Sequence, residues 1–193
     1  AIDVTGVPEV GVKIATDALK NHKHVVMMDV ETDVVIGSYL KKLGDQNGVI
    51  YTGSAGDEPG AVMELYSFAK AMGMQVKVMG KGKNNKLDYA CNPDTVLEEA
   101  TRRKMSPRML CAFKDGTKTM VEMTAMSNAT GLIPDVIGGH GPSASPAERC
   151  KELNAIFKLK KDGGILNQHG VVEYVNGIAP GVFVTVATEN EEI

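Results

Sequence analysis

Lysines and amides gather in one short segment behind a predicted strand, residues 80–86 (Gly-Lys-Gly-Lys-Asn-Asn-Lys). Glycine adopts backbone angles that other residues avoid, so such a segment can wrap closely around a ligand. The ammonium groups of Lys81 and Lys83 and the amide of Asn84 would then hold a phosphate, a carboxylate or a developing oxyanion. A charged loop is often only a solvated turn, but its position at a strand end favours an anion site, with Asn84 as a substrate ligand.

Carboxylates occupy a second strand end, where a turn of small residues opens a helix. Asp57 and Glu58 follow Gly56 in this turn. They could accept protons or bind a metal, although a simple cap of the helix is an equally good interpretation of either residue. Glu31, behind the strand predicted at 24–28, is either a functional carboxylate or an exposed one in the first turn of a helix.

A third group of polar residues lies in a methionine-rich helix predicted from Asp115 to residue 128 or 129. Lys118 and Glu122 share a face of this helix at a spacing of four residues, which is typical of a surface ion pair. The methionines, however, indicate burial on most sides, and buried polar groups are either hydrogen-bonded or functional. Both interpretations stay open, and we keep Glu122 as a catalytic candidate and Lys118 and Asn128 as substrate ligands.

One histidine is a candidate because of its loop. His140 lies in a Gly-Gly-His-Gly-Pro run within residues 132–144, a segment long for a connection without secondary structure and therefore more often functional than filler. If this segment folds over a site as a lid, His140 would contact the substrate. The sequence has neither a Ser/His/Asp order nor a His-Glu-x-x-His run, so nothing supports a hydrolase.

Composition narrows the function classes further. The chain has 193 residues, 43% of them hydrophobic, and a net charge of −3, which indicates a globular protein and excludes a general nucleic-acid binder. Its longest uncharged stretch in the N-terminal half, 46–56, is far too short to span a bilayer. Three cysteines without Cys-x-x-Cys spacing indicate buried thiols and no disulfide or zinc framework. We expect a cytoplasmic protein with no membrane or nucleic-acid partner, and we assign no metal ligands.

Residues 1–79 alternate short β-branched runs with amphipathic stretches, which is the pattern of a parallel α/β sheet. We predict strands at 2–4, 24–28, 49–52 and 75–79, and helices at 8–21, from Thr32 or Asp33 to 46, and from 56 to 73. A G-x-G-x-x-G turn is missing, and the chain begins within a strand. We therefore expect the C-terminal half of a Rossmann-like dinucleotide-binding domain, in an internal piece of a longer protein.

Residues 80–193 follow a different pattern, so we place a domain boundary at 79/80 and predict an α+β catalytic and dimerisation domain with a mixed sheet. Its predicted helices begin at Asn92, at Asp115 and at the capping box of residues 145–148, the last running to Phe157. Its predicted strands are 109–113 and two antiparallel ones, 171–174 and 181–188. An acidic, frayed end follows at 189–193.

Several of these motifs occur in the order of one enzyme family: Asp-Val-Thr-Gly (3–6), His-Val-Val-Met-Met-Asp-Val-Glu (24–31), Gly-Asp-Glu-Pro-Gly (56–60), Lys-Gly-Lys-Asn-Asn (81–85), and the helix from Asp115 to Gly131. Together they resemble the homoserine-dehydrogenase-like oxidoreductases with a C-terminal SAF-type domain, a group that includes the deoxyxylulose phosphate reductoisomerase-like enzymes. The likeness covers nearly the whole chain. Homoserine dehydrogenases proper place a lysine behind the His-Val-Val strand, where this chain has Asp29-Val30-Glu31, so homoserine is in doubt as the substrate.

The resemblance implies roles for the candidates. Thr5, Gly6 and Glu31 would border the nicotinamide of NAD(P), with Gly56 also on the cofactor side, and the glycine fingerprint would precede Ala1. Asp57 and Glu58 would line the substrate pocket. Lys81 and Lys83 would bind or protonate the substrate oxygen, because an ammonium stabilises an alkoxide as it forms.

The resulting prediction is hydride transfer between NAD(P) and a carbonyl or hydroxyl group of a small polar substrate, phosphorylated or not. We expect a homo-oligomer, most simply a homodimer, and an inactive enzyme if this chain is only a fragment. The alternative is a non-enzymatic module for oligomerisation or ligand sensing, whose mixed sheet pairs across a two-fold axis.

Overall fold

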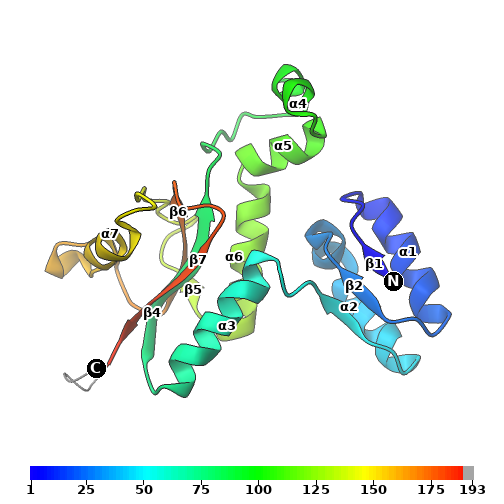
Figure 1. Cartoon of the computed structure of the whole chain (residues 1–193), viewed down its shortest axis with the longest axis horizontal. Helices are drawn as coiled ribbons and strands as arrows, with labels where there is room; N and C mark the ends of the chain where they lie inside the picture. Colours follow the sequence, from blue (N-terminus) through cyan, green and yellow to red (C-terminus); the bar gives the residue numbers. More distant parts are fainter. Residues whose placement is uncertain (189–193) are drawn as a thin grey trace. The chain divides into compact units, whose positions relative to one another are not determined.

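A computed structural model describes residues 1–188 and divides them into two compact units, 1–60 and the part from Ala61 onward (Figure 1). The first contains a three-stranded parallel sheet and the second a four-stranded mixed sheet, and helices pack on both. The predicted α/β class, with a parallel sheet followed by an α+β part, is therefore confirmed. The acidic end predicted at 189–193 lies outside the described residues.

The first unit is built from two βα repeats and a third strand: β1 (Ile2–Asp3), α1 (Pro8–Lys20), β2 (Val25–Met27), α2 (Val30–Gln46) and β3 (Tyr51–Gly53). The strands lie in the order β1-β2-β3, and all pair in parallel. Alternate strand residues pack with the apolar faces of α1 and α2 in one core, which contains Ala15, Leu19, Val25, Met27, Leu40, Leu43, Val49 and Tyr51.

Local sequence signals explain where these helices begin. Pro8 occupies the first turn of α1, where its missing N–H group costs no hydrogen bond. Asp29 caps α2, and its carboxylate accepts hydrogen bonds from Thr32 N (3.3 Å) and Thr32 Oγ1 (2.8 Å). The predicted start of α2 at Thr32 or Asp33 is thus too late, because the carboxylate that caps the helix directly follows the strand.

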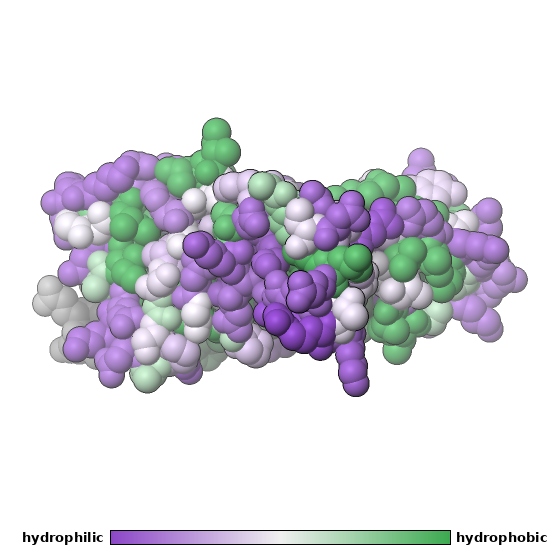
Figure 2. Space-filling model, turned by 90° about the horizontal axis from the view of Figure 1, so that it is seen from above, coloured by the Kyte–Doolittle hydropathy of each residue, from purple (hydrophilic) through white to green (hydrophobic). Residues whose placement is uncertain are grey.

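The other face of the parallel sheet has no helix within this unit. Ile2, Met28 and Ile50 leave 68, 47 and 60% of their surface exposed, because α1 and α2 both cover the opposite face. Figure 2 shows one face of the molecule, on which separate hydrophobic patches lie between hydrophilic side chains.

The mixed sheet of the second unit has the strand order β5-β6-β4-β7, formed by Ile133–Pro134, Val171–Asn176, Gln75–Lys83 and Val182–Ala187. β4 pairs in parallel with β6 and antiparallel with β7. The prediction that β4 continues the N-terminal parallel sheet is wrong, because its backbone groups bond to strands from the C-terminal end of the chain. β6 and β7 run in opposite directions as predicted, but β4 lies between them. The compact units consequently divide at residue 60, whereas the functional division at 79/80 stays a prediction.

Helices cover both faces of the mixed sheet (Figure 1). On one face, α3 (Glu58–Ala71) and α6 (Thr117–Thr130) form a core with alternate residues of β4 and β6, among them Met79 and Val172. On the other face, Val78 and Val171 pack with the α7 (Arg149–Ile156) side chain Leu153 and with Phe157. Val78 and Met79 therefore point to opposite faces of the sheet, because successive side chains of a strand alternate. The same holds for Val171 and Val172.

The helices α4 (Leu97–Arg103) and α5 (Pro107–Lys114) pack against each other, and a 3₁₀ helix, η1 (Lys160–Asp162), follows α7. The strand predicted at 109–113 is wrong, because these residues form α5, with Pro107 in its first turn. Asn92 caps a turn and not a helix, since its side chain accepts from Asp94 N and Thr95 N (both 3.0 Å) and α4 begins five residues later.

The capping box predicted at 145–148 is also wrong in detail. α7 begins at Arg149 without a side-chain cap, and Ser145 N donates to the carboxylate of Glu152 (2.6 Å). All three cysteines are free thiols, but the predicted burial holds only for Cys111, which packs in the core of α4 and α5; Cys91 is half-buried and Cys150 is exposed.

Candidate active site

The predicted lysine loop is the end of a strand. Residues 80–83 belong to β4, so the loop predicted to begin at residue 80 is wrong at these positions, and both lysines are buried. Their role in binding an anion stays a prediction. Gly80 and Gly82 let other backbone segments approach β4 closely. A Cβ on Gly80 would lie 1.8 Å from Glu173 O, and one on Gly82 would lie 2.5 Å from Ala179 N. Side chains along a strand alternate between the two faces of the sheet, so Lys81 and Lys83 lie on the same face. Both point toward α5 and α6.

Lys81 forms a buried ion pair with Glu122. Its Nζ donates to Glu122 Oε2, and the side chains are 8 and 0% exposed. Glu122 lies in the second turn of α6, on the side that packs against β4 and β6, so the interpretation that places it at the surface is wrong. A buried pair of this kind holds an ammonium group in a fixed orientation in surroundings of low polarity.

Lys83 lies two residues further along the same face. Its ammonium group donates to the carbonyl of Phe113, near the end of α5. Burial, and next the positive charge of Lys81, lower the pKa of Lys83, although Asp115 and Glu122 partly offset the effect. The geometry therefore gathers two ammonium groups and one carboxylate on the α6 face of the sheet, an arrangement that can stabilise an oxyanion and donate a proton.

The predicted substrate ligands are placed differently. Asn84 directly follows the lysines, and its exposed amide donates to Ala179 O (2.8 Å). Lys118 Nζ lies 6.0 Å from the centre of the Phe113 ring, close to the residue that binds Lys83. Asn128 is exposed near the C-terminal end of α6, beyond Glu122. Asn84 and Lys118 thus lie beside the group formed by Lys81, Lys83 and Glu122. Asn128 contacts none of the residues that bind this group in the described part of the chain.

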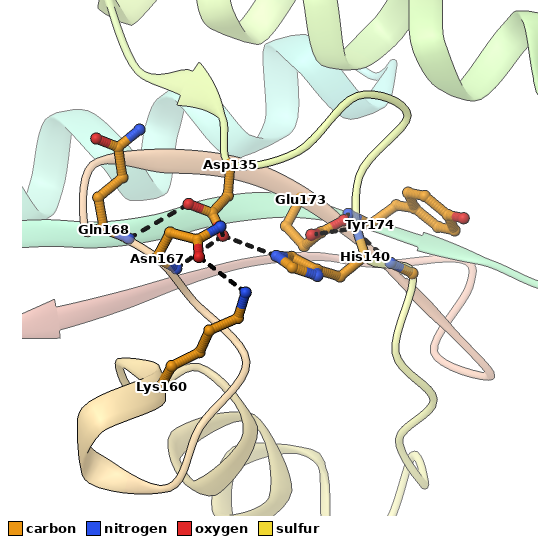
Figure 3. A network of polar contacts seen from close by, with 8 residues as sticks. Asp135, His140, Lys160, Asn167, Gln168, Glu173 and Tyr174 are labelled. Atoms are coloured by element: carbon orange, nitrogen blue, oxygen red, sulfur yellow. Dashed lines mark hydrogen bonds and ion pairs between the residues drawn. The ribbon is translucent and has the colours of Figure 1, made fainter.

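His140 belongs to a second polar cluster (Figure 3). Its Nε2 lies 2.7 Å from Asp135 Oδ2, and the same carboxylate accepts from Asn167 N (2.9 Å) and Gln168 N (3.3 Å). Burial acts to raise the pKa of Asp135, but the hydrogen bonds from His140, Asn167 and Gln168 outweigh burial and lower it. Asp135 thus ties His140 to the segment that contains Asn167 and Gln168, and the role of His140 in a lid stays a prediction.

Glu173 holds the other side of this loop. The carboxylate is fully buried in β6 and accepts from the backbone N–H groups of His140 (2.7 Å), Gly141 (3.3 Å) and Tyr174 (2.9 Å). Sequence reasoning missed both Asp135 and Glu173. For Glu173 a signal existed, since it is the one charge inside the apolar run Val-Val-Glu-Tyr-Val of residues 171–175.

The predicted cofactor residues lie in the first unit at the carboxyl ends of its strands. Thr5 and Gly6 follow β1, and Gly6 has a positive φ of 62°. Glu31 lies in the first turn of α2, behind β2. Gly56 N donates to Ser54 Oγ (3.3 Å) in the turn behind β3. All four therefore stand where ligands bind in open parallel sheets.

The same edge holds two buried carboxylates that the sequence did not single out, Asp3 and Asp29. Gly11 of α1 packs directly on them, because a Cβ there would lie 2.4 Å from Asp3 Oδ2. Asp57 and Glu58 stand at the start of α3, where Asp57 Oδ1 accepts from Glu58 N (3.0 Å). Their predicted roles as proton acceptors or metal ligands stay predictions.

Comparison with known proteins was informative at the family level. Residues 56–193, more than half of the chain, match the sequence model of the family described as oxidoreductase DRL, catalytic domain. The curated proteins contained no match. Within residues 1–188, no helix has the length and apolar character needed to cross a bilayer.

Proposed function

The chain belongs to the family of oxidoreductase DRL catalytic domains, and on that basis we propose that it carries the reaction centre of an NAD(P)-dependent oxidoreductase. The reaction is hydride transfer between the nicotinamide and a carbonyl or hydroxyl carbon of a small polar substrate, phosphorylated or not. The observation that carries this proposal is the buried Lys81–Glu122 pair with Lys83 beside it, all within the matched residues.

The lysines suit the chemistry of a carbonyl reduction. NAD(P)H supplies the hydride when it is bound. The carbonyl oxygen gains negative charge as its carbon is reduced, and the ammonium of Lys81 stabilises this charge and donates the proton that completes the hydroxyl group. Glu122 positions Lys81 through the buried ion pair, and Lys83 adds a second positive charge on the same face.

The cofactor residues fit one end of NAD(P). Thr5 and Gly6 are small and exposed, and the left-handed backbone at Gly6 lets a planar ring approach closely, so we assign them, with Glu31 and Gly56, to the nicotinamide end. The turn from β1 to α1 does not fit a pyrophosphate. It lacks the glycine fingerprint, and Pro8 removes an N–H group at the helix start that would bind phosphate. The residues described here therefore include no pyrophosphate ligand at this turn.

Two finer features complete the proposal. We infer the homoserine-dehydrogenase-like type of reductase from the ordered motifs of the sequence. We also propose a homodimer, because β7 is an edge strand of the mixed sheet without a charged residue, and such an edge favours pairing with another strand. The cytoplasmic location expected from the sequence stays part of the proposal. Asp57, Glu58, Asn84, Lys118, Asn128 and His140 keep their proposed substrate-facing roles.

The proposal is tested with the product of the full reading frame that encodes this chain, by following the absorbance of NADH and NADPH with a panel of small 2-oxo acids, hydroxyketones and their phosphate esters. We expect oxidation of one of the two cofactors with at least one member of the panel, at a rate that requires Lys81. A chain that binds such compounds without oxidising either cofactor would instead be the ligand-sensing module that the sequence leaves as the alternative.

A further inference from the structure

A cavity of about 410 Å³ opens on the α7 face of the mixed sheet, on the opposite side from the Lys81–Glu122 pair. Strands β4 and β7, helix α7 and the segment that follows α7 form its walls. Its polar lining consists of Lys77, Asn154, Lys158, Asp162, His169 and Thr185. None of these residues has a role in the proposed reaction.

The charge of this lining is positive. Two ammonium groups, Lys77 and Lys158, face one carboxylate, Asp162. Within the part of the chain that the structure describes, neither ammonium group forms an ion pair or a hydrogen bond. Burial, and next the positive charge of Lys77, lower the pKa of His169, and Asp162 does not fully offset them. The lining therefore carries two ammonium groups against one carboxylate, and its formal charge is positive.

A buried hydroxyl group in the same wall also lacks a partner. Thr185 Oγ1 of β7 is inaccessible to solvent and forms no hydrogen bond within residues 1–188. Leaving a buried donor unsatisfied is unfavourable, so such a group in a native wall usually marks an interaction with something else. Thr185 lines the cavity, so a rotation about its Cα–Cβ bond would present this hydroxyl group to an oxyanion bound there.

We propose that this cavity is a second ligand site, which binds a small molecule carrying a phosphate or carboxylate group on a short apolar body. The two lysines and the Thr185 hydroxyl would hold the oxyanion. Leu153, Phe157 and Leu159 line the rest of the cavity and would contact the apolar body. The site stands independently of the proposed hydride transfer, because it shares no residue with that centre.

The test is an NMR titration of the His169 imidazole with inorganic phosphate, phenyl phosphate and acetate at constant ionic strength. We expect a saturable shift and a rise in the pKa of His169, because a bound anion stabilises the imidazolium ion. Lys77→Met should weaken binding about tenfold through loss of a charge-assisted hydrogen bond. Thr185→Val should weaken it about threefold, while the unliganded protein becomes no less stable.

Lys151→Met is the matched control, because Lys151 is an exposed residue of α7 that does not line the cavity. It removes the same charge and should leave binding unchanged. Lys158→Met repeats the test at an exposed position if Lys77→Met disturbs β4. Tighter binding of phenyl phosphate than of phosphate supports the apolar contact, and preference for phosphate or acetate identifies the anion. An absent or unsaturable shift, or equal losses in the Lys77 and Lys151 variants, would overturn the proposal.

Discussion

Lys81→Met is expected to lower kcat/KM of the NAD(P)H-dependent reaction by about a thousandfold, the contribution typical of a positioned proton donor. Methionine retains an unbranched side chain out to the Cε position but lacks the ammonium group that stabilises the forming alkoxide. The loss should appear in kcat more than in KM, because the interaction is strongest when charge has developed. Steady-state kinetics with the best substrate of the panel would measure it.

Two variants separate chemistry from stability in this result. Lys81→Met alone leaves the carboxylate of Glu122 buried without this ammonium group, which should lower the free energy of unfolding by about 3 kcal/mol. Lys81→Met combined with Glu122→Leu removes both charges and should regain most of that stability, yet stay inactive. Lys86→Met, at an exposed position beyond β4, should keep wild-type kinetics. An active double variant would refute the role of Lys81.

Glu173→Ala is expected to lower the free energy of unfolding by about 4 kcal/mol, since it removes an acceptor of buried hydrogen bonds and leaves a cavity. The carboxylate accepts three backbone N–H groups, from His140, Gly141 and Tyr174. Without it the loop of residues 138–141 loses its main attachment to β6. Denaturant unfolding would measure the effect.

The matched control is Glu152→Ala, which removes a carboxylate that accepts a single N–H group, from Ser145, near the surface. We expect a loss of about 1 kcal/mol or less for this variant. Similar losses for the Glu152 and Glu173 variants would contradict the role given to the buried carboxylate.

The local elements of the first unit could be predicted because local signals determine them. Pro8 and the apolar spacing behind it predict α1, and the β-branched runs predict the three strands within a few residues. The partners of β4 could not be predicted in this way. Its pairing with β6 and β7 depends on residues about a hundred positions away, and periodicity carries no information about such contacts.

The misinterpreted segments have identifiable physical causes. Gly80 and Gly82 have the composition of a turn, but here they allow other backbone segments to approach a strand. The run at 109–113 is too short for periodicity to separate strand from helix, and Pro107 was the better signal.

The candidate site was predictable in part. A glutamate among methionines indicated that Glu122 is buried, and strand-end position indicated Lys81 and Lys83, although as a loop. The same reasoning applied to the apolar run of β6 would have found Glu173. Asp135 could not be found, because only tertiary structure brings it to His140.

The most direct test of the central claim is isotope transfer from NADPH or NADH deuterated at the reactive C4 position. With the best substrate of the panel, we predict one deuterium on the reduced carbon of the product for each cofactor oxidised, and about a thousandfold slower labelling in Lys81→Met. Product formed without the label, or labelled at the wild-type rate by Lys81→Met, would contradict the assignment of Lys81 and Glu122 as the centre of a hydride-transferring enzyme.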